Sequence, residues 1–223
     1  MVAGLVSCPC CHGVVDATEC ALLAHAFTCK RVAHSKRHEI VKKALVNFWR
    51  SYSIDMDNGE PKIITFFPAK EFAPTASEEK RELVQNRRGD ILVRLKRNGG
   101  FYMLDTVVTA PHTSRTAAPL AAGTAARAAE LKKHASYERD FQVTPGRFVP
   151  FALEVYGAWG EEASKFLRVI ASNELEGRVG DIAKFERECA VFVSVALQRE
   201  VAVQLQSFKT ALAAQAVGAG GGL

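Results

Sequence analysis

Apolar residues recur at helical spacing in several stretches of the chain. Between residues 35 and 51, Ile40, Ala44 and Phe48 follow one another every four positions, and Ser35 stands where an N-cap residue is expected. This pattern predicts a helix over 35–51. Four further segments read as helices: Glu78–Val84, the Ala-rich Ala121–Asp140, Trp159–Ser172 and Asp181–Val217.

Two neighbouring runs favour β-strands instead. Asp90–Lys96 and Phe101–Thr109 are rich in aliphatic and aromatic residues, and Asn98-Gly99-Gly100 between them tolerates the positive φ angles of a hairpin turn. Four further segments are a buried strand at Arg147–Gly157, a short strand at Lys62–Phe67, and loops at 54–61 and 68–77. The order of these elements predicts a mixed α/β sandwich around a small sheet.

The composition is that of a globular protein. A chain of 223 residues with 48% apolar and 24% charged residues is expected to form one domain, with room for a small appendage. This balance excludes a disordered chain, a collagen and a disulfide-knotted mini-protein. The longest apolar run, Cys189–Leu197, is shorter than the roughly 18 residues that a membrane-spanning helix needs. We therefore expect a soluble protein with no membrane partner.

Positive charge is concentrated near the N-terminus. The net charge of the whole chain is a modest +5, but between Lys30 and Arg50 seven basic residues face one acid, Glu39. Such a basic stretch favours a polyanionic partner. A solvated helix face that happens to be basic is the alternative interpretation.

Five of the six cysteines lie within the first 29 residues. The first residues show neither a basic segment nor a long apolar stretch of the secretory kind, so we expect a reducing compartment and a metal site rather than disulfides. Cys8 and Cys11 are separated by two residues, His25 and Cys29 by three, and the two pairs by thirteen. This spacing predicts a tetrahedral zinc site in a knuckle too small to fold without its ion.

Other residues near these pairs leave the identity of the zinc ligands open. Four of them are within reach of the same ion: Cys10, His12, Cys20 and His34. Free thiols in a small apolar cap are the alternative to a metal site.

Two aspartates occur in the predicted hairpin, where aspartate is disfavoured. Asp90 opens the first strand and Asp105 lies within the second, with fourteen residues between them. The two carboxylates are expected to converge at one end of the sheet, where they could hold Mg²⁺. As an alternative, Asp90 after Gly89 is a turn residue.

The helix that follows adds cationic and phenolic groups. Lys133 and Tyr137 are four residues apart and share one helix face, whereas Lys132 lies on an adjacent face. Lys133 is the preferred candidate to orient an attacking water, with Lys132 in reserve. An ordinary surface pair between Glu130 and Lys133 is the alternative.

Taken together, these motifs resemble the C-terminal restriction-like endonuclease of site-specific non-LTR retrotransposons, a branch of the PD-(D/E)xK nuclease superfamily. The resemblance spans roughly residues 8–157. It rests on the order of five motifs: the Cys8, Cys11, His25, Cys29 knuckle, the basic Lys36-Arg37-His38, the Asp90 of RRGDILV, the Asp105 of LDTVVT, and the helix ELKKHASY. In the family, Gly89 would be proline and the residue at Val107 would be lysine, a role that Lys133 takes here. The chain has no room for the reverse transcriptase that normally precedes such a nuclease, so it looks like a detached piece.

The resemblance implies a restriction-endonuclease-like α-β-β-β-α-β core that nicks target DNA to prime reverse transcription. Asp90 and Asp105 would ligate Mg²⁺, Lys133 would position the nucleophilic water, and Tyr137 would support the site. The knuckle would bind zinc, and four residues after it would hold nucleic acid by its phosphates: Arg37, His38, Lys42 and Lys43. DNA is the expected partner, RNA a second candidate, and the nucleus the expected location.

The expected organisation is a zinc knuckle at 1–34, the nuclease-like domain at 35–175, a helical segment at 176–217 and a flexible tail at 218–223. Two other functions remain open. One is an inactive, zinc-dependent, nucleic-acid-binding remnant. The other is a protein-interaction domain that uses an apolar face of the last helix: Val191, Val195, Leu197, Val201, Leu205, Phe208 and Leu212.

Overall fold

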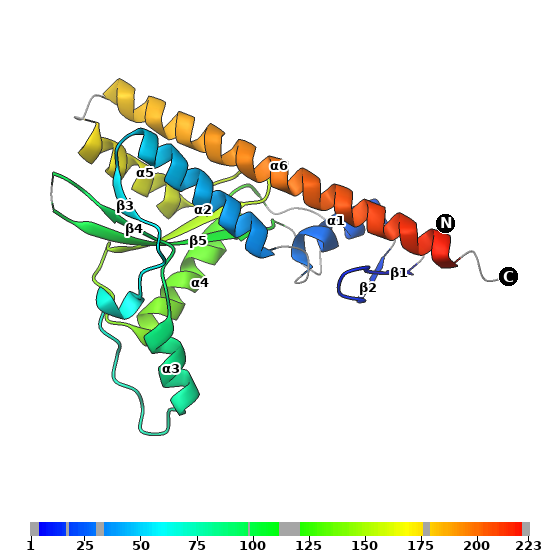
Figure 1. Ribbon diagram of the computed structural model, residues 1–223, viewed down its shortest axis with the longest axis horizontal. Coiled ribbons are helices and arrows are strands. Elements are labelled where there is room, and N and C mark those ends of the chain that lie inside the picture. The colour runs from blue at the N-terminus through cyan, green and yellow to red at the C-terminus, as the bar shows by residue number, and fades with distance from the viewer. Residues whose placement is uncertain are drawn as a thin grey trace.

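A four-stranded mixed sheet forms the centre of the computed structural model (Figure 1). The structure describes residues 5–16, 18–29, 34–97, 99–111, 121–175 and 179–219. The strands follow one another in space in the order β3 (Asp55–Asp57), β4 (Ile91–Arg94), β5 (Phe101–Thr109) and β6 (Phe148–Glu154). Strands β3 and β4 pair antiparallel, as do β4 and β5, whereas β6 runs parallel to β5 after a helical crossover. The mixed α/β sheet predicted from the sequence is thereby confirmed.

The helices also follow the predicted pattern. Their bounds are α2 (His34–Ser51), α3 (Glu78–Asn86), α4 (Thr124–Asp140), α5 (Glu161–Glu174) and α6 (Val179–Ala219). Residues 220–223, the end of the predicted tail, lie outside the described part of the chain.

Two local predictions were wrong. The predicted loop at 54–61 contains β3. This edge strand exposes both of its aspartates to solvent, so its Asp-Met-Asp sequence shows no apolar run that would predict a strand. The predicted strand Lys62–Phe67 is instead the 3₁₀ turn η1 (Ile63–Thr65), with a single bridge from Lys62 to Arg88. The turn directs Ile63 and Phe67 into the same core.

The alternation of side chains along the strands divides the core into two layers. Ile91, Val93 and Leu104 pack with α2, α5 and α6 on one face, while Leu92 and Met103 pack with α4 and η1 on the other. Because side chains alternate along a strand, position 105 of β5 faces α4 and position 106 faces α2. This alternation decides which helix meets which polar residue of the candidate site.

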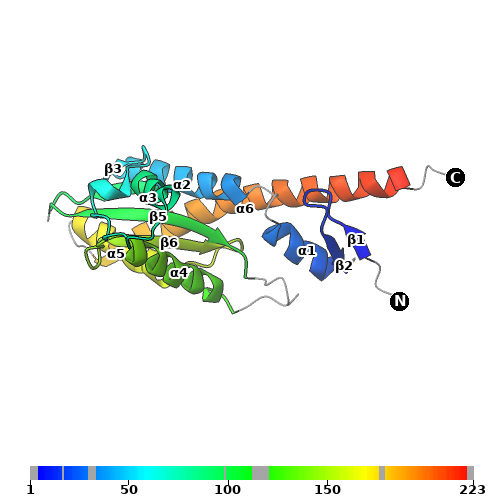
Figure 2. The same cartoon turned by 90° about the horizontal axis from the view of Figure 1, so that it is seen from below.

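The N-terminal segment forms a separate small unit beside α6. It consists of β1 (Leu5–Ser7), β2 (Val14–Asp16) and α1 (Glu19–Thr28), with β1 and β2 paired antiparallel. In both views α6 extends past the sheet, and this unit lies along its C-terminal part (Figures 1 and 2). Phe208 of α6 is buried against Cys8 and Cys29 of the unit.

The apolar face of α6 mostly packs within the chain. Leu197, Val201 and Phe208 are buried, whereas Val191 and Val195 are 59% and 44% exposed. The face proposed as a partner surface is therefore largely occupied by the protein's own core. Among the described residues, no helix is long and apolar enough to cross a membrane.

Two buried glutamates hold the N-termini of α4 and α5. Glu154 accepts hydrogen bonds from the backbone N–H groups of Ala125 and Ala126. Glu130 accepts from the N–H groups of Glu162 and Ala163, and burial raises the pKa of its carboxyl. Glu130 is 2% exposed, so the alternative of a surface pair with Lys133 is wrong. A carboxylate at this position satisfies N–H groups that have no partner within the helix.

Replacing Gly160 by alanine is expected to destabilise the protein through Glu130. A Cβ at Gly160 would overlap the Glu130 carboxylate and push it from the start of α5. The loss of these buried hydrogen bonds should cost about 1–3 kcal/mol, seen as a lower melting temperature by circular dichroism. Glu130→Ala should cost a similar amount, and the double variant should not cost the sum. Additive losses would contradict a shared cause.

Candidate functional site

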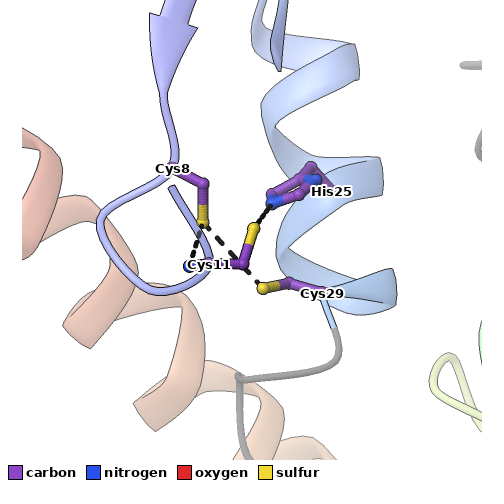
Figure 3. A group of neighbouring side chains, drawn as sticks. All are labelled: Cys8, Cys11, His25 and Cys29. Atoms are coloured by element: carbon purple, nitrogen blue, oxygen red, sulfur yellow. Dashed lines mark hydrogen bonds between the residues drawn. The ribbon is translucent and has the colours of Figure 1, made fainter. Parts of the chain in front are cut away.

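The first cluster of candidate ligands lies in the N-terminal unit (Figure 3). The turn between β1 and β2 carries Cys8 and Cys11, and α1 carries His25 in its last turn. Cys29 caps the end of α1, where its N–H donates to the carbonyl of His25. The turn and the helix end thus bring the two sequence pairs together.

The distances between these ligands match a zinc site. The Sγ atoms of Cys8 and Cys29 are 3.9 Å apart, and Cys11 Sγ lies 3.5 Å from His25 Nε2. Tetrahedral ligands of zinc are about 3.8 Å apart for two sulfurs and about 3.6 Å apart for a sulfur and a nitrogen. All four ligand atoms lie within 4.8 Å of one another. The cluster could therefore hold a zinc ion without rearrangement.

Backbone N–H groups donate hydrogen bonds to two of the sulfurs. Cys8 Sγ accepts from the N–H groups of Cys10 and Cys11, and Cys11 Sγ accepts from Gly13. Burial by itself raises the pKa of the Cys8 thiol, but hydrogen bonds from Cys11, Cys10 and His25 outweigh it and lower that pKa to about 6. Zinc binds the deprotonated thiolate, so the turn favours the metal-binding form.

The other nearby candidates do not join this cluster within the described residues. Cys10 lies outside the group of four, and burial together with the nearby Cys8 raises the pKa of its thiol. His12 is exposed in the turn, with a φ of 59°. The side chains of Cys20 and His34 lie outside the part of the chain that the structure describes.

The second cluster lies where α2 and α4 meet the sheet. Asp90 immediately precedes β4, and its Oδ2 accepts from the backbone N–H of Thr106 at 2.5 Å and from the Thr106 hydroxyl at 2.6 Å. His38 of α2 places Nε2 2.9 Å from the same oxygen and 2.8 Å from Thr106 Oγ1. A ligand atom from each of His38, Asp90 and Asp105 lies within 4.8 Å of the others.

Asp105 is held from the opposite side by α4. Its Oδ2 lies 2.7 Å from Lys133 Nζ and accepts from the Tyr137 hydroxyl at 2.7 Å. Tyr137 is fully buried, and its ring stacks on that of Phe148. The Arg87 guanidinium lies over the Tyr137 ring, 4.1 Å from the ring centroid. Asp105, Lys133 and Tyr137 are thus brought together as the sequence predicts. Lys132 is exposed, so the geometry selects Lys133.

The two carboxyl groups have opposite pKa shifts. Burial, and then the charge of Asp90, raise the pKa of Asp105 despite the nearby Lys133. Burial also acts to raise the pKa of Asp90, but hydrogen bonds from His38 and Thr106 outweigh it and hold that pKa below its usual value. Burial and Asp105 raise the pKa of Tyr137, which keeps its proton. The site therefore holds two neighbouring carboxyl groups with different partners. Asp105 lies beside the Lys133 ammonium, and Asp90 lies beside His38 and the Thr106 N–H.

One oxygen of each carboxylate remains available. Within the described part of the chain, the hydrogen bonds to Asp90 and Asp105 all go to Oδ2. This leaves Oδ1 of each group as a donor for an ion. Carboxylate oxygens are the ligands that divalent cations such as Mg²⁺ and Mn²⁺ accept.

Each of the four residues expected to bind phosphates has a partner within the protein. Arg37 is 1% exposed and donates to the carbonyl of Phe27. Lys42 is buried between Glu39 and Glu60, at 3.0 and 2.6 Å. The expectation that Arg37 and Lys42 lie free for nucleic acid was wrong, because these positions of α2 face the protein.

His38 and Lys43 complete this group. His38 turns toward Asp90 rather than toward solvent, and Lys43 has the 68% exposed side chain of a surface residue. Sequence reasoning missed Thr106 and the role of His38. The available signal was the polar Thr106 next to Asp105, since its side chain points to the opposite face, where α2 lies.

Gly89, which stands where the resembling family has proline, is explained by packing. Its N–H donates to the carbonyl of Pro61, a bond that proline cannot make. A Cβ there would overlap Met103 and lie close to Ile63. The chain before Asp90 is thus fixed by a hydrogen bond and by close packing.

Comparison with known proteins assigns no family to the chain. No model of a known protein family matches it, and no curated protein is significantly similar to it. What the clusters can do follows from their own residues: three sulfurs and a nitrogen in one, and two carboxylates, an imidazole and a lysine in the other.

Proposed function

We propose that this chain is a metal-dependent DNA endonuclease of the restriction-endonuclease-like class, related to the nucleases of site-specific non-LTR retrotransposons. The observation that carries the proposal is the closeness of Asp90, Asp105 and Lys133: Asp90, just before β4, lies near Asp105 of β5, and Lys133 of α4 contacts Asp105. Apart from η1 and α3, the succession α2-β3-β4-β5-α4-β6 agrees with the α-β-β-β-α-β core that the resemblance implies.

A divalent cation, Mg²⁺ by the resemblance, would be held by Asp90 and Asp105. The donor set fits such an ion because each carboxylate keeps one oxygen without a partner among the described residues. When bound, the ion would polarise the scissile phosphate and neutralise charge on the leaving oxygen.

The surrounding residues have separate roles in hydrolysis. The Lys133 ammonium would orient the attacking water and stabilise negative charge that develops on the phosphate. Tyr137 keeps its proton and donates a hydrogen bond to Asp105, which holds that carboxylate in a single orientation. Thr106 does the same for Asp90. In the reaction the water oxygen bonds to phosphorus, and the 3′ oxygen of the cut strand leaves as a hydroxyl.

DNA binding would involve exposed charge rather than the buried part of the basic stretch. Lys36 and Lys43 are exposed on α2, and the zinc knuckle lies at the end of α6. Contacts with phosphates imply binding that weakens as salt rises and carries little sequence information. The substrate would place the protein in the nucleus.

The proposal is tested by plasmid nicking with zinc-loaded protein, in Mg²⁺ and in EDTA. Lys133→Met should lower the rate by about 100-fold, the order lost with one preorganised charge-stabilising donor. Lys132→Met is the matched control, one residue away and exposed, and should nick at the parental rate.

Two results would count against the nuclease. Equal rates for Lys133→Met and Lys132→Met would refute the assigned role of Lys133. Salt-dependent DNA binding without nicking in any divalent metal would instead identify an inactive nucleic-acid-binding remnant.

A further inference from the structure

His38 enters the acidic cluster from a different element than the other members. It comes from α2, whereas Asp90 and Asp105 come from the sheet, and its Nε2 lies 2.9 Å from Asp90 Oδ2. We propose that His38 Nε2 is a third metal ligand, so that the site prefers a transition-metal dication over Mg²⁺. This inference rests on the metal site of the proposed function and names the ion that the site selects.

The geometry suits coordination by three side chains. The ligand atoms of His38, Asp90 and Asp105 all lie within 4.8 Å of one another, close enough to surround one ion. The His38 side chain is 31% exposed and that of Asp90 is 12% exposed, so the cluster is sheltered yet open to an entering ion. An imidazole beside two carboxylates adds a nitrogen donor that transition metals accept more readily than Mg²⁺ does.

A purely supporting role would leave His38 largely redundant. Asp90 Oδ2 already accepts two hydrogen bonds from Thr106, one from its N–H and one from its hydroxyl. These bonds fix the carboxylate without a histidine.

The donor types predict the metal preference. Mg²⁺ is usually bound through one or two carboxylates and keeps several waters, and it gains little from a nitrogen ligand. Imidazole favours transition metals. With only Asp90 and Asp105, the site would lack this preference, so His38 is the residue that would confer it.

The experiment measures Mn²⁺ binding directly, on the full chain with its knuckle loaded with zinc. Calorimetric titration gives the Mn²⁺ and Mg²⁺ affinities, and pulsed electron paramagnetic resonance detects a nitrogen nucleus bound to Mn²⁺. We expect the parent to bind Mn²⁺ at least about tenfold more tightly than Mg²⁺ and to show nitrogen coupling. His38→Ala should lose the coupling and at least about tenfold in Mn²⁺ affinity, the preference that the imidazole confers, with a smaller effect on Mg²⁺.

Two further variants separate coordination from support. His38→Gln keeps a hydrogen-bonding group but no imidazole, and should behave like His38→Ala. Thr106→Val removes a hydrogen bond to Asp90 but no ligand, and should keep the nitrogen coupling. Parental Mn²⁺ binding without nitrogen coupling, or rescue by His38→Gln, would overturn the inference.

The outcomes also distinguish this inference from the proposed nuclease. Mn²⁺ binding that depends on His38, without DNA cleavage, would support the ligand role and count against the nuclease. Cleavage that continues in His38→Ala with unchanged Mn²⁺ affinity would do the reverse. Absence of Mn²⁺ binding in the folded parent would overturn the inference.

Discussion

Asp90→Asn and Asp105→Asn are each expected to lower nicking by at least about 1,000-fold while DNA binding is retained. Each change replaces a carboxylate ligand by a neutral amide, and the loss of a bound metal removes several kcal/mol of transition-state stabilisation, where about 4 kcal/mol corresponds to 1,000-fold. Plasmid nicking measures the rate, and filter binding at low salt measures the affinity. Asp57→Asn, in the neighbouring strand β3 and exposed to solvent, is the matched control and should nick normally.

Asp105→Asn should lose activity without losing stability. Burial, and then the charge of Asp90, raise the pKa of Asp105, which means that the folded protein holds this carboxyl group close to a second acid at an energetic cost. An asparagine at 105 relieves this repulsion, although Lys133 then loses its anionic partner, so the melting temperature should stay near that of the parent. Asp90→Asn should lower the melting temperature, because hydrogen bonds from His38 and Thr106 outweigh burial, hold the pKa of Asp90 below its usual value and so stabilise its charged form in the fold. A variant that nicks in a metal-dependent way would refute the assignment of its aspartate.

Removal of zinc is expected to unfold the N-terminal unit and to release the C-terminal part of α6. Bound zinc contributes about 10 kcal/mol or more to the folding of such small units. Without the unit, Phe208 loses its buried contacts with Cys8 and Cys29. The predicted readout is tryptic cleavage after Lys209, which should become rapid in a zinc chelator.

A second site in the same helix provides the internal control. Arg199 is exposed but lies between Leu197 and Val201, which are buried in the main core, so cleavage there should stay slow. Cys11→Ser should mimic the chelator, whereas Cys10→Ser, one residue away and outside the ligand group, should not. Equal resistance of both variants to trypsin would show that Cys11 is not a zinc ligand.

The elements that the sequence predicts well are those with local signals. The hairpin of β4 and β5 has its turn residues between two apolar runs, and α2 has its apolar face at a fixed spacing. Strand β3 has no such signal. It is a three-residue edge strand that pairs with β4 alone, and Met56 is its one residue that is not exposed. Edge pairing of this kind is set by the partner strand, which the local sequence does not reveal.

The candidate site was predictable in its acids and less so in its basic residues. Asp105, Lys133 and Tyr137 meet because one strand and one helix face determine them. Arg37 and Lys42 were assigned from a charge count, which does not tell which side of a helix faces the protein. Both lie on the buried side of α2, where carbonyl and carboxylate oxygens compensate them.

The single helix α6 runs without interruption from the main core to the N-terminal unit. A continuous helix of this kind fixes the rotation of the N-terminal unit relative to the sheet. Two residues inserted between Val201 and Phe208 would turn the N-terminal unit by about 200° around the helix axis while moving it only about 3 Å along that axis. The insertion would leave both ends folded but facing different sides. If the protein cuts DNA as proposed, the cleavage site and the DNA segment covered by the N-terminal unit would lie a fixed distance apart. The length of α6, rather than the residues at either of its ends, would set that distance.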